Sequence, residues 1–291
     1  MKYLEKHPGI VMVIGILGIS LSSIFIKYST APSSVSAAWR LIWTVALLTP
    51  AVFGRKTSRR ELLGLGKREL VLSILSGLFL AIHFAFWFEA LKQTSVASAA
   101  TIVCTEVIWV SLGYCVFLKG KLSLRAVASI AVALLGSVCI AWSDSGTGGS
   151  HLYGDMLALL AAAAVAVYVL LGRVVQQKVS TTVYTYVVYV SCALALVTLC
   201  LCQGEGITGH GPSPIVVGIL LAVFSTLLGH SIFSWCLKYF TPSFVSAAKL
   251  MEPVVASILA AFLFREIPTA LQLLGGGLIL SGLYTYAKTE Q

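Results

Sequence analysis

The chain has 291 residues, of which 58% are hydrophobic and 11% are charged, and its formal net charge is +9. A soluble globular domain carries about 25% charged residues, so this chain has too little polar surface to fold in water. The positive charge would suit a nucleic-acid partner, but the basic residues lie in short segments between apolar stretches, and none is expected. The composition predicts an integral membrane protein.

Apolar stretches long enough to cross a bilayer recur along the whole sequence. A spanning helix needs about 20 residues to cross ~30 Å of hydrocarbon. The first stretch is too long for a removable signal peptide, and we expect it to stay in the protein. The predicted fold is all-α, a polytopic membrane protein with ten transmembrane helices, at residues 9–27, 35–54, 70–91, 95–118, 122–142, 152–173, 182–202, 214–238, 242–264 and 268–287.

The distribution of Lys and Arg predicts the orientation. With the N-terminus inside, the inner segments hold fifteen of the twenty Lys and Arg residues and the outer segments hold three. The remaining two, Arg40 and Lys249, lie within spans. Because short cytoplasmic loops are enriched in basic residues, we expect both termini in the cytoplasm. The chain has no Asn and hence no glycosylation sequon, which is compatible with the bacterial inner membrane that we expect.

The sequence contains an internal duplication. A shift of 146 residues aligns the spans of residues 1–146 with those of residues 147–291, and it matches Glu106 with Glu252 and Gly136 with Gly282. Each half holds five predicted spans, an odd number, so the two repeats should be inverted about a pseudo-twofold axis in the membrane plane. Such repeats can exchange conformations, which favours alternating access. The alternative is a duplication that only enlarged a helix bundle.

Two segments carry a resemblance to a known family. They are 91–100 (LKQTSVASAA) and 251–282, which includes Glu252-Pro253, Arg265-Glu266 and three glycines at 275–277. They resemble EamA-type members of the drug/metabolite transporter superfamily, and Arg40 matches an arginine that is frequent there. The resemblance covers essentially the whole chain and implies two five-helix repeats and transport. Val107 stands where many relatives have a proline, so the fourth span lacks the usual cause of a bend.

Two carboxylates are predicted near the membrane midplane. Glu106 lies about 18 Å along its span and Glu252 about 15 Å along its own. An ionised side chain at that depth costs at least about 2.5–3.5 kcal/mol, which suggests a partner or a water-filled cavity. We expect both at one central cavity, where one or both bind a substrate ammonium or a proton. The alternative is a structural salt bridge between Glu252 and Lys249, three residues earlier on the same helical face.

Arg40 lies about 9 Å from the predicted outer end of its span, shallow enough for its guanidinium to snorkel to the interface. Its alternative role is to hold a substrate carboxylate through two parallel hydrogen bonds. Trp39 and Trp43 stand four residues apart on the same span. They are candidates for an interfacial aromatic belt or for a cavity wall.

His83 and Trp87 also stand four residues apart, with His83 about 20 Å into its span. His83 could bind substrate, relay a proton or bond a neighbouring helix, and His230 falls one position from its repeat equivalent. Trp87 and Trp109 could line a site for a flat or cationic ligand, or simply pack the bundle. The serines of the first span and the glycines of the tenth are assigned to helix contacts.

Catalytic motifs are missing from the sequence. It has no HExxH, GxSxG or GxxxxGK[ST] pattern, so an enzyme is not expected, and a membrane-embedded enzyme is the remote alternative. No metal or cofactor is expected, because the seven cysteines show no ligand spacing. The sequence predicts a monomeric secondary transporter for a small organic metabolite, favouring an amino-acid-like or aromatic solute. A multidrug or cation exporter coupled to protons remains the alternative.

Overall fold

The structure is a computed structural model that describes residues 6–94, 96–144, 152–255, 258–259 and 269–289. All regular secondary structure in these residues is helical. Eight helices are long and apolar enough to cross a membrane, and they match eight of the ten predicted spans. They are Pro8–Ile26, Ser33–Phe53, Lys67–Gln93, Ala99–Phe117, Leu152–Val175, Thr181–Cys202, Ser213–Cys236 and Ala270–Ala287.

The two other predicted spans are only partly accounted for. The fifth, at 122–142, is helix α9 (Leu124–Asp144), whose apolar part Leu124–Ile140 is shorter than the eight helices above. The ninth, at 242–264, begins as α14 (Pro242–Ala248) and continues as the 3₁₀ helix η2 (Lys249–Met251). Most of its second half, together with Arg265 and Glu266, lies outside the described residues. The count of ten therefore stays a prediction.

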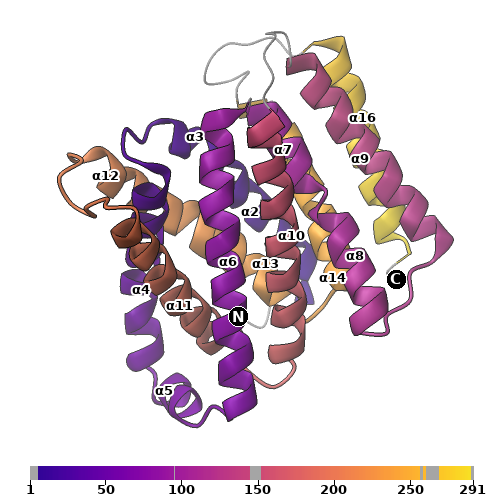
Figure 1. Cartoon of the computed structure of the whole chain (residues 1–291). Helices are drawn as coiled ribbons and strands as arrows, with labels where there is room; N and C mark the ends of the chain where they lie inside the picture. The colour runs from indigo at the N-terminus through magenta and orange to yellow at the C-terminus, as the bar shows by residue number, and fades with distance from the viewer. Residues whose placement is uncertain (1–5, 95, 145–151, 256–257, 260–268, 290–291) are drawn as a thin grey trace.

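Six of the helices run without interruption through the described residues. They are α4 (Ser33–Phe53), α6 (Lys67–Gln93), α9, α10 (Leu152–Val175), α11 (Thr181–Cys202) and α16 (Ala270–Ala287). In α11 the hydroxyl of Ser180 caps the first turn by accepting a hydrogen bond from the backbone N–H of Val183. These helices form the frame of the molecule (Figure 1).

Three other spans are interrupted. The first consists of α2 (Pro8–Ser20) and α3 (Ser22–Lys27), and the fourth of α7 (Val96–Cys104) and α8 (Glu106–Phe117). The eighth passes from α12 (Ser213–Leu220) through a π-helix, η1 (Leu221–His230), into α13 (Ser231–Cys236). π-helical segments occur frequently at functional sites, because they redirect side chains within a helix.

The break in the fourth span occurs without a proline. The hydroxyl of Thr105 donates a hydrogen bond to the carbonyl oxygen of Ile102 at 2.6 Å, and its backbone N–H donates to the same oxygen at 3.0 Å. These tight local bonds replace the regular α-helical pattern at Thr105. Glu106 thereby becomes the first residue of a new helix, α8.

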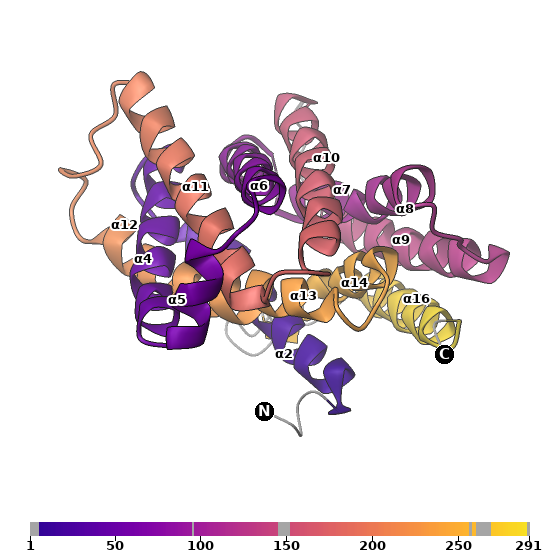
Figure 2. The ribbon, with the colours of Figure 1, turned by 90° about the horizontal axis from the view of Figure 1, so that it is seen from below.

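The helix contacts repeat when the two halves of the chain are exchanged. The packing of α2 on η1 corresponds to that of α10 on α6, and the packing of α4 on α12 corresponds to that of α11 on α6. The pairs α4 with α11 and α9 with α16 map onto themselves. Figures 1 and 2 show α9 and α16 side by side at one edge of the molecule.

Close backbone contact between α9 and α16 depends on glycines. A Cβ atom on Gly136 would lie 2.5 Å from the carbonyl oxygen of Gly275, and one on Gly282 would lie 2.7 Å from that of Ser129. The 146-residue shift converts the first of these contacts into the second. The prediction that glycines of the tenth span serve helix packing is confirmed for Gly275 and Gly282.

Contacts between connecting segments group them at two ends of the molecule. At one end, Glu61 of the short helix α5 (Lys56–Leu63) accepts hydrogen bonds from the backbone N–H and the hydroxyl of Ser180, each at 2.6 Å. At the other end, the Lys92 ammonium donates to the carbonyl oxygen of Ala31 at 3.1 Å. Figure 1 shows α5 at the lower end and α3 and α12 at the upper end. The 27-residue helix α6 connects the two ends.

Candidate functional site

A pocket is lined by residues of both repeats. Its cavity volume is about 30 Å³, within about 450 Å³ of space that no atom fills and that is partly open to solvent. Seven of the ten residues that the sequence analysis singled out lie on its wall: Arg40, His83, Trp87, Glu106, His230, Lys249 and Glu252. The other lining residues are Ile19, Ser22, Phe84, Val103, Cys104 and Val165.

Equivalent positions of the two repeats meet at this pocket. At the 146-residue shift its lining contains four matched pairs: Ile19 with Val165, Phe84 with His230, Val103 with Lys249, and Glu106 with Glu252. The pairs are equivalent in position but only partly in chemistry. The second repeat supplies an imidazole and an ammonium where the first supplies a phenyl ring and a valine.

The two pocket carboxylates differ in their partners. The Lys249 ammonium donates a hydrogen bond to Glu106 Oε1 at 2.8 Å, and both side chains are 6% exposed. This ion pair joins the two repeats. Glu252 is also buried, but the described part of the chain contains no ion pair to its carboxylate. The pairing of Lys249 with Glu252 that helical spacing suggested is therefore not formed, because the side chain of Lys249 reaches across to α8.

Arg40 is buried in the pocket wall and only 1% exposed. Its Nε donates to Thr226 Oγ1 at 2.7 Å and its Nη1 to Ser22 Oγ at 3.4 Å, while its guanidinium carbon lies 4.2 Å from the centre of the Phe84 ring. The expected snorkelling does not occur, because α3 and η1 cover the side chain laterally. Sequence reasoning assigned Ser22 to packing and did not single out Thr226, since single hydroxyls in apolar helices give no specific signal.

His83 bonds a neighbouring helix, as one of its predicted roles required. Its Nδ1 lies 2.9 Å from the carbonyl oxygen of Ala161 on α10. Since a carbonyl only accepts, Nδ1 carries the proton in this contact. The His83 ring centre lies 6.2 Å from that of His230. His83 therefore helps to hold α6 against α10 while it also lines the pocket.

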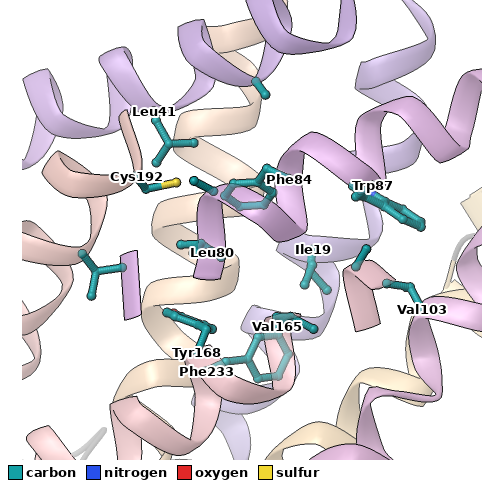
Figure 3. Packing of buried hydrophobic residues seen from close by; sticks show 14 of the residues in the cluster. Ile19, Leu41, Leu80, Phe84, Trp87, Val103, Val165, Tyr168, Cys192 and Phe233 are labelled. Carbon is teal, nitrogen blue, oxygen red and sulfur yellow. The ribbon is translucent and has the colours of Figure 1, made fainter. Parts of the chain in front are cut away.

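Apolar side chains make up the rest of the pocket wall. Figure 3 shows Ile19, Phe84, Trp87, Val103 and Val165, which come from helices of both repeats. Phe84 is fully buried and Trp87 is 4% exposed. This wall would suit the hydrocarbon or aromatic part of a ligand, while the charged groups would suit its polar ends.

Three predicted tryptophans do not line the pocket. Trp39 donates its indole N–H to the carbonyl oxygen of Ile207 at 3.0 Å, and its ring stacks on Trp43 with centroids 6.2 Å apart. Trp109 is 40% exposed on the outer surface of α8. For this pocket, the cavity-wall interpretation of these three residues is not supported, because their helices turn them to other surfaces.

The sequence profile of the EamA-like transporter family matches residues 8–142 and 152–287. The chain belongs to the EamA-like transporter family. The family is part of the drug/metabolite transporter superfamily, and two separate matches agree with two copies of one repeat. As an EamA-like transporter, the protein is a multi-pass membrane protein, and the family to which it belongs is one of transporters.

Relatives of this EamA-like transporter are named as transporters. An uncharacterized transporter of Archaeoglobus fulgidus is 24% identical over 261 residues, which cover 88% of each chain. An uncharacterized transporter of Bacillus subtilis is 25% identical over 75% of this chain and 70% of its own. A Salmonella typhimurium protein named a probable amino-acid metabolite efflux pump is 28% identical over 74% of this chain and 77% of its own.

A solved crystal structure has the same fold. It superposes on this EamA-like transporter with a TM-score of 0.79 and covers 98% of both chains at 20% sequence identity. At that identity the likeness concerns the fold alone. The arrangement of helices around the pocket is thus shared with a protein of different sequence.

Proposed function

We propose that this EamA-like transporter is a secondary carrier that moves a small organic metabolite across the cytoplasmic membrane by alternating access. The observation that carries the proposal is the burial of charges of both signs, from both repeats, in one pocket: Arg40, Lys249, Glu106 and Glu252. Charges inside a membrane protein are costly, and they typically mark the path of a substrate or an ion.

The arrangement of the repeats supports alternating access. Helix contacts have counterparts when the two halves are exchanged, as α2 with η1 and α10 with α6 show. The family profile also matches each half separately. Ser180 lies at the end of the molecule that holds α5, whereas its equivalent Ser34 is the second residue of α4, directly after the segment at the opposite end. These facts support two inverted repeats about a pseudo-twofold axis. The excess of Lys and Arg in the predicted inner segments supports both termini in the cytoplasm, and we propose the bacterial inner membrane.

The pocket favours a zwitterionic or aromatic solute. Because Lys249 already neutralises Glu106, Glu252 is the carboxylate that remains for a substrate ammonium or a proton. Phe84 and Trp87 supply the apolar side. A lipophilic cation fits less well, since Arg40 and Lys249 would repel it. An amino-acid-like metabolite is therefore the preferred substrate, as the name of the Salmonella typhimurium relative also suggests.

Counterflow in proteoliposomes tests the proposed function. Liposomes containing the purified protein are loaded with unlabelled amino acids, amines or lipophilic dyes, and uptake of the labelled compound is measured. We expect saturable uptake of amino-acid-like solutes that increases when the same solute is present inside. Uptake of dyes alone, driven by a pH gradient, would favour the multidrug exporter instead. Uptake that rises linearly with concentration and ignores the internal solute would contradict a carrier.

Glu252→Gln tests the assigned carboxylate. The substitution keeps the size of the side chain but removes the negative charge, so counterflow should fall at least about tenfold, the effect of losing roughly 1.4 kcal/mol of interaction. Membrane insertion and thermal stability should be retained. The control is Glu89→Gln on α6, because Glu89 is not a pocket residue and its carboxylate accepts a hydrogen bond from Gln93 at 2.8 Å. Wild-type counterflow in Glu252→Gln would exclude Glu252 as the partner of a substrate ammonium.

A further inference from the structure

Two nitrogen atoms on the pocket wall have no hydrogen-bond partner in the described part of the chain. They are Nη2 of Arg40 and Nδ1 of His230, whose residues are 1% and 3% exposed. Buried polar atoms are nearly always hydrogen-bonded, so each exception requires an explanation. In a pocket of a transporter, a polar group of the substrate is the natural partner.

The guanidinium of Arg40 is held by one edge and free at the other. Thr226 Oγ1 accepts from Nε at 2.7 Å and donates its own proton to the carbonyl oxygen of Leu221 at 3.2 Å. Leu221 and Thr226 are five residues apart in the π-helix η1, the spacing that this helix type brings together. Both N–H groups of Nη2 stay available, and Nη1 has a second N–H besides the one directed to Ser22.

Arg40 and His230 both lie against the ring of Phe84. The Arg40 guanidinium carbon lies 4.2 Å from the centre of the Phe84 ring, and the His230 ring lies 5.3 Å from the same centre at an interplanar angle of 84°. Arg40 and His230 therefore flank one aromatic ring. In the tautomer with a proton on Nδ1, His230 adds a further donor to those of Arg40.

Arg40 and Glu252 are the two charged residues of the pocket that have no direct ion-pair partner among the described residues. Lys249 is paired with Glu106, whereas no ion pair to Arg40 occurs among the described residues. A substrate carboxylate would pair with Arg40, and an ammonium on the same solute would pair with Glu252. A phosphate dianion would need a second free cation, and Lys249 is already engaged.

We propose that Arg40 and His230 form a carboxylate subsite, so that the substrate is a small carboxylic acid or amino acid with an apolar or aromatic body. The carboxylate oxygens bind Nη1 and Nη2 of Arg40, Nδ1 of His230 donates to one of them, and the body of the substrate packs against Phe84 and Trp87. This assignment rests on the proposed transport function and specifies which chemical group that site recognises.

Matched ligands test the carboxylate subsite directly. The thermal stability of the purified protein is measured with L-phenylalanine, 3-phenylpropionate, L-phenylalaninamide and 2-phenylethylamine, and with the corresponding L-leucine series. We expect the carboxylates to raise the Tm most, and the amides and amines, which keep only the ammonium that Glu252 can bind, to raise it less. If no carboxylate raises the Tm, or if the amides act equally, the assignment is overturned.

Substitutions of Arg40 and His230 test whether these two residues cause the rise in Tm. Arg40→Met should abolish the extra rise that the carboxylates cause and Arg40→Lys should weaken carboxylate binding at least about tenfold, because an ammonium lacks the planar fork. Arg59→Met is the control, since Arg59 is exposed on α5. His230→Gln should weaken binding less than Arg40→Met. Retention of carboxylate binding by Arg40→Met would overturn the subsite.

Thr226 provides a second test that does not remove the arginine. Thr226→Val removes the acceptor of Nε but keeps the size of the side chain, so it should raise KM for the carboxylate with little change in kcat. Thr226→Ser should restore the wild-type KM. If Thr226→Val leaves KM unchanged, the positioning of Arg40 by η1 is refuted. If a metabolite without a carboxyl group shows counterflow that is unchanged by Arg40 substitutions, the carrier function stands and only the carboxylate subsite is refuted.

Discussion

Lys249 and Glu106 belong to different repeats, and each is the ion-pair partner of the other at 2.8 Å. Their separation from water makes the pair costly to form and more costly to break, because removal of one partner leaves an uncompensated buried charge. Glu106 lies in the first turn of α8, and the partial positive charge at the N-terminus of a helix stabilises the ionised form of its carboxylate. The pair is thus a specific connection between the two halves.

Lys249→Met should lower the free energy of unfolding by about 3 kcal/mol, the lower part of the range for a broken buried pair. The measurement is the thermal midpoint in detergent, evaluated as a double-mutant cycle with Glu106→Gln. The double variant should recover most of the loss, because no buried charge is left unpaired. Lys178→Met is the control, because the Lys178 side chain is 72% exposed in its ion pair with Glu69 and such surface pairs contribute little to stability. Additive losses in the double variant would contradict the coupling.

Sequence reasoning located the pocket residues better than their partners. The cost of burying a charge depends on residue type and depth, and both can be read from a predicted span, as for Glu106 and Glu252. The partner of Lys249 and the burial of Arg40 depend on which helices pack together. The sequence of a single span does not give this information. Trp109 illustrates the same limit, because an aromatic residue suits a pocket and a lipid-facing surface equally well.

Helix interruptions lie beside the pocket carboxylates of both repeats. Glu106 follows the break at Thr105, and Glu252 follows the 3₁₀ helix η2 at the equivalent position. Pro253 gave a sequence signal for the second break. The first break has no proline and arises from hydrogen bonds to one carbonyl oxygen, which composition does not reveal. The π-helix η1 likewise has no sequence signature, although it positions Arg40 through Thr226.

Packing of α9 on α16 gives a prediction at the level of the helix pair. Gly275→Ala should lower the Tm, because its Cβ would lie 2.6 Å from the backbone oxygen of Gly136, which cannot move aside alone. Gly277→Ala is the matched control two residues away, where nothing lies within 4 Å of the new Cβ. Alanine is favoured over glycine in a helix by about 1 kcal/mol, so the control should be neutral or stabilising. Equal Tm values for both variants would mean that the glycine contact does not hold the two helices.

Across the whole molecule, symmetric packing surrounds an asymmetric pocket. Several helix contacts, such as α2 with η1 and α10 with α6, are preserved when the repeats are exchanged. By contrast, Phe84 and His230, or Val103 and Lys249, occupy equivalent positions with different chemistry. Symmetric packing allows two exchanged conformations, and the asymmetric lining lets one ligand present different groups to the two halves. If the proposed alternating access operates, the inward-open and outward-open states share this packing and differ in free energy through the pocket residues.

Inverted repeats require that equivalent positions face opposite sides of the membrane, and cysteine labelling tests this requirement. Arg60 and Gly206 are equivalent at the 146-residue shift, and both are exposed after the second span of their repeats. Each is replaced by Cys in a protein whose seven native cysteines have been changed to Ala or Ser. A membrane-impermeant maleimide should label Gly206→Cys in intact cells and Arg60→Cys only in inside-out vesicles, because the excess of basic residues beside Arg60 favours the cytoplasm. Labelling of both variants in detergent controls for reactivity. If both are labelled from the same side, the repeats are parallel, and alternating access by exchange of their conformations loses its structural basis.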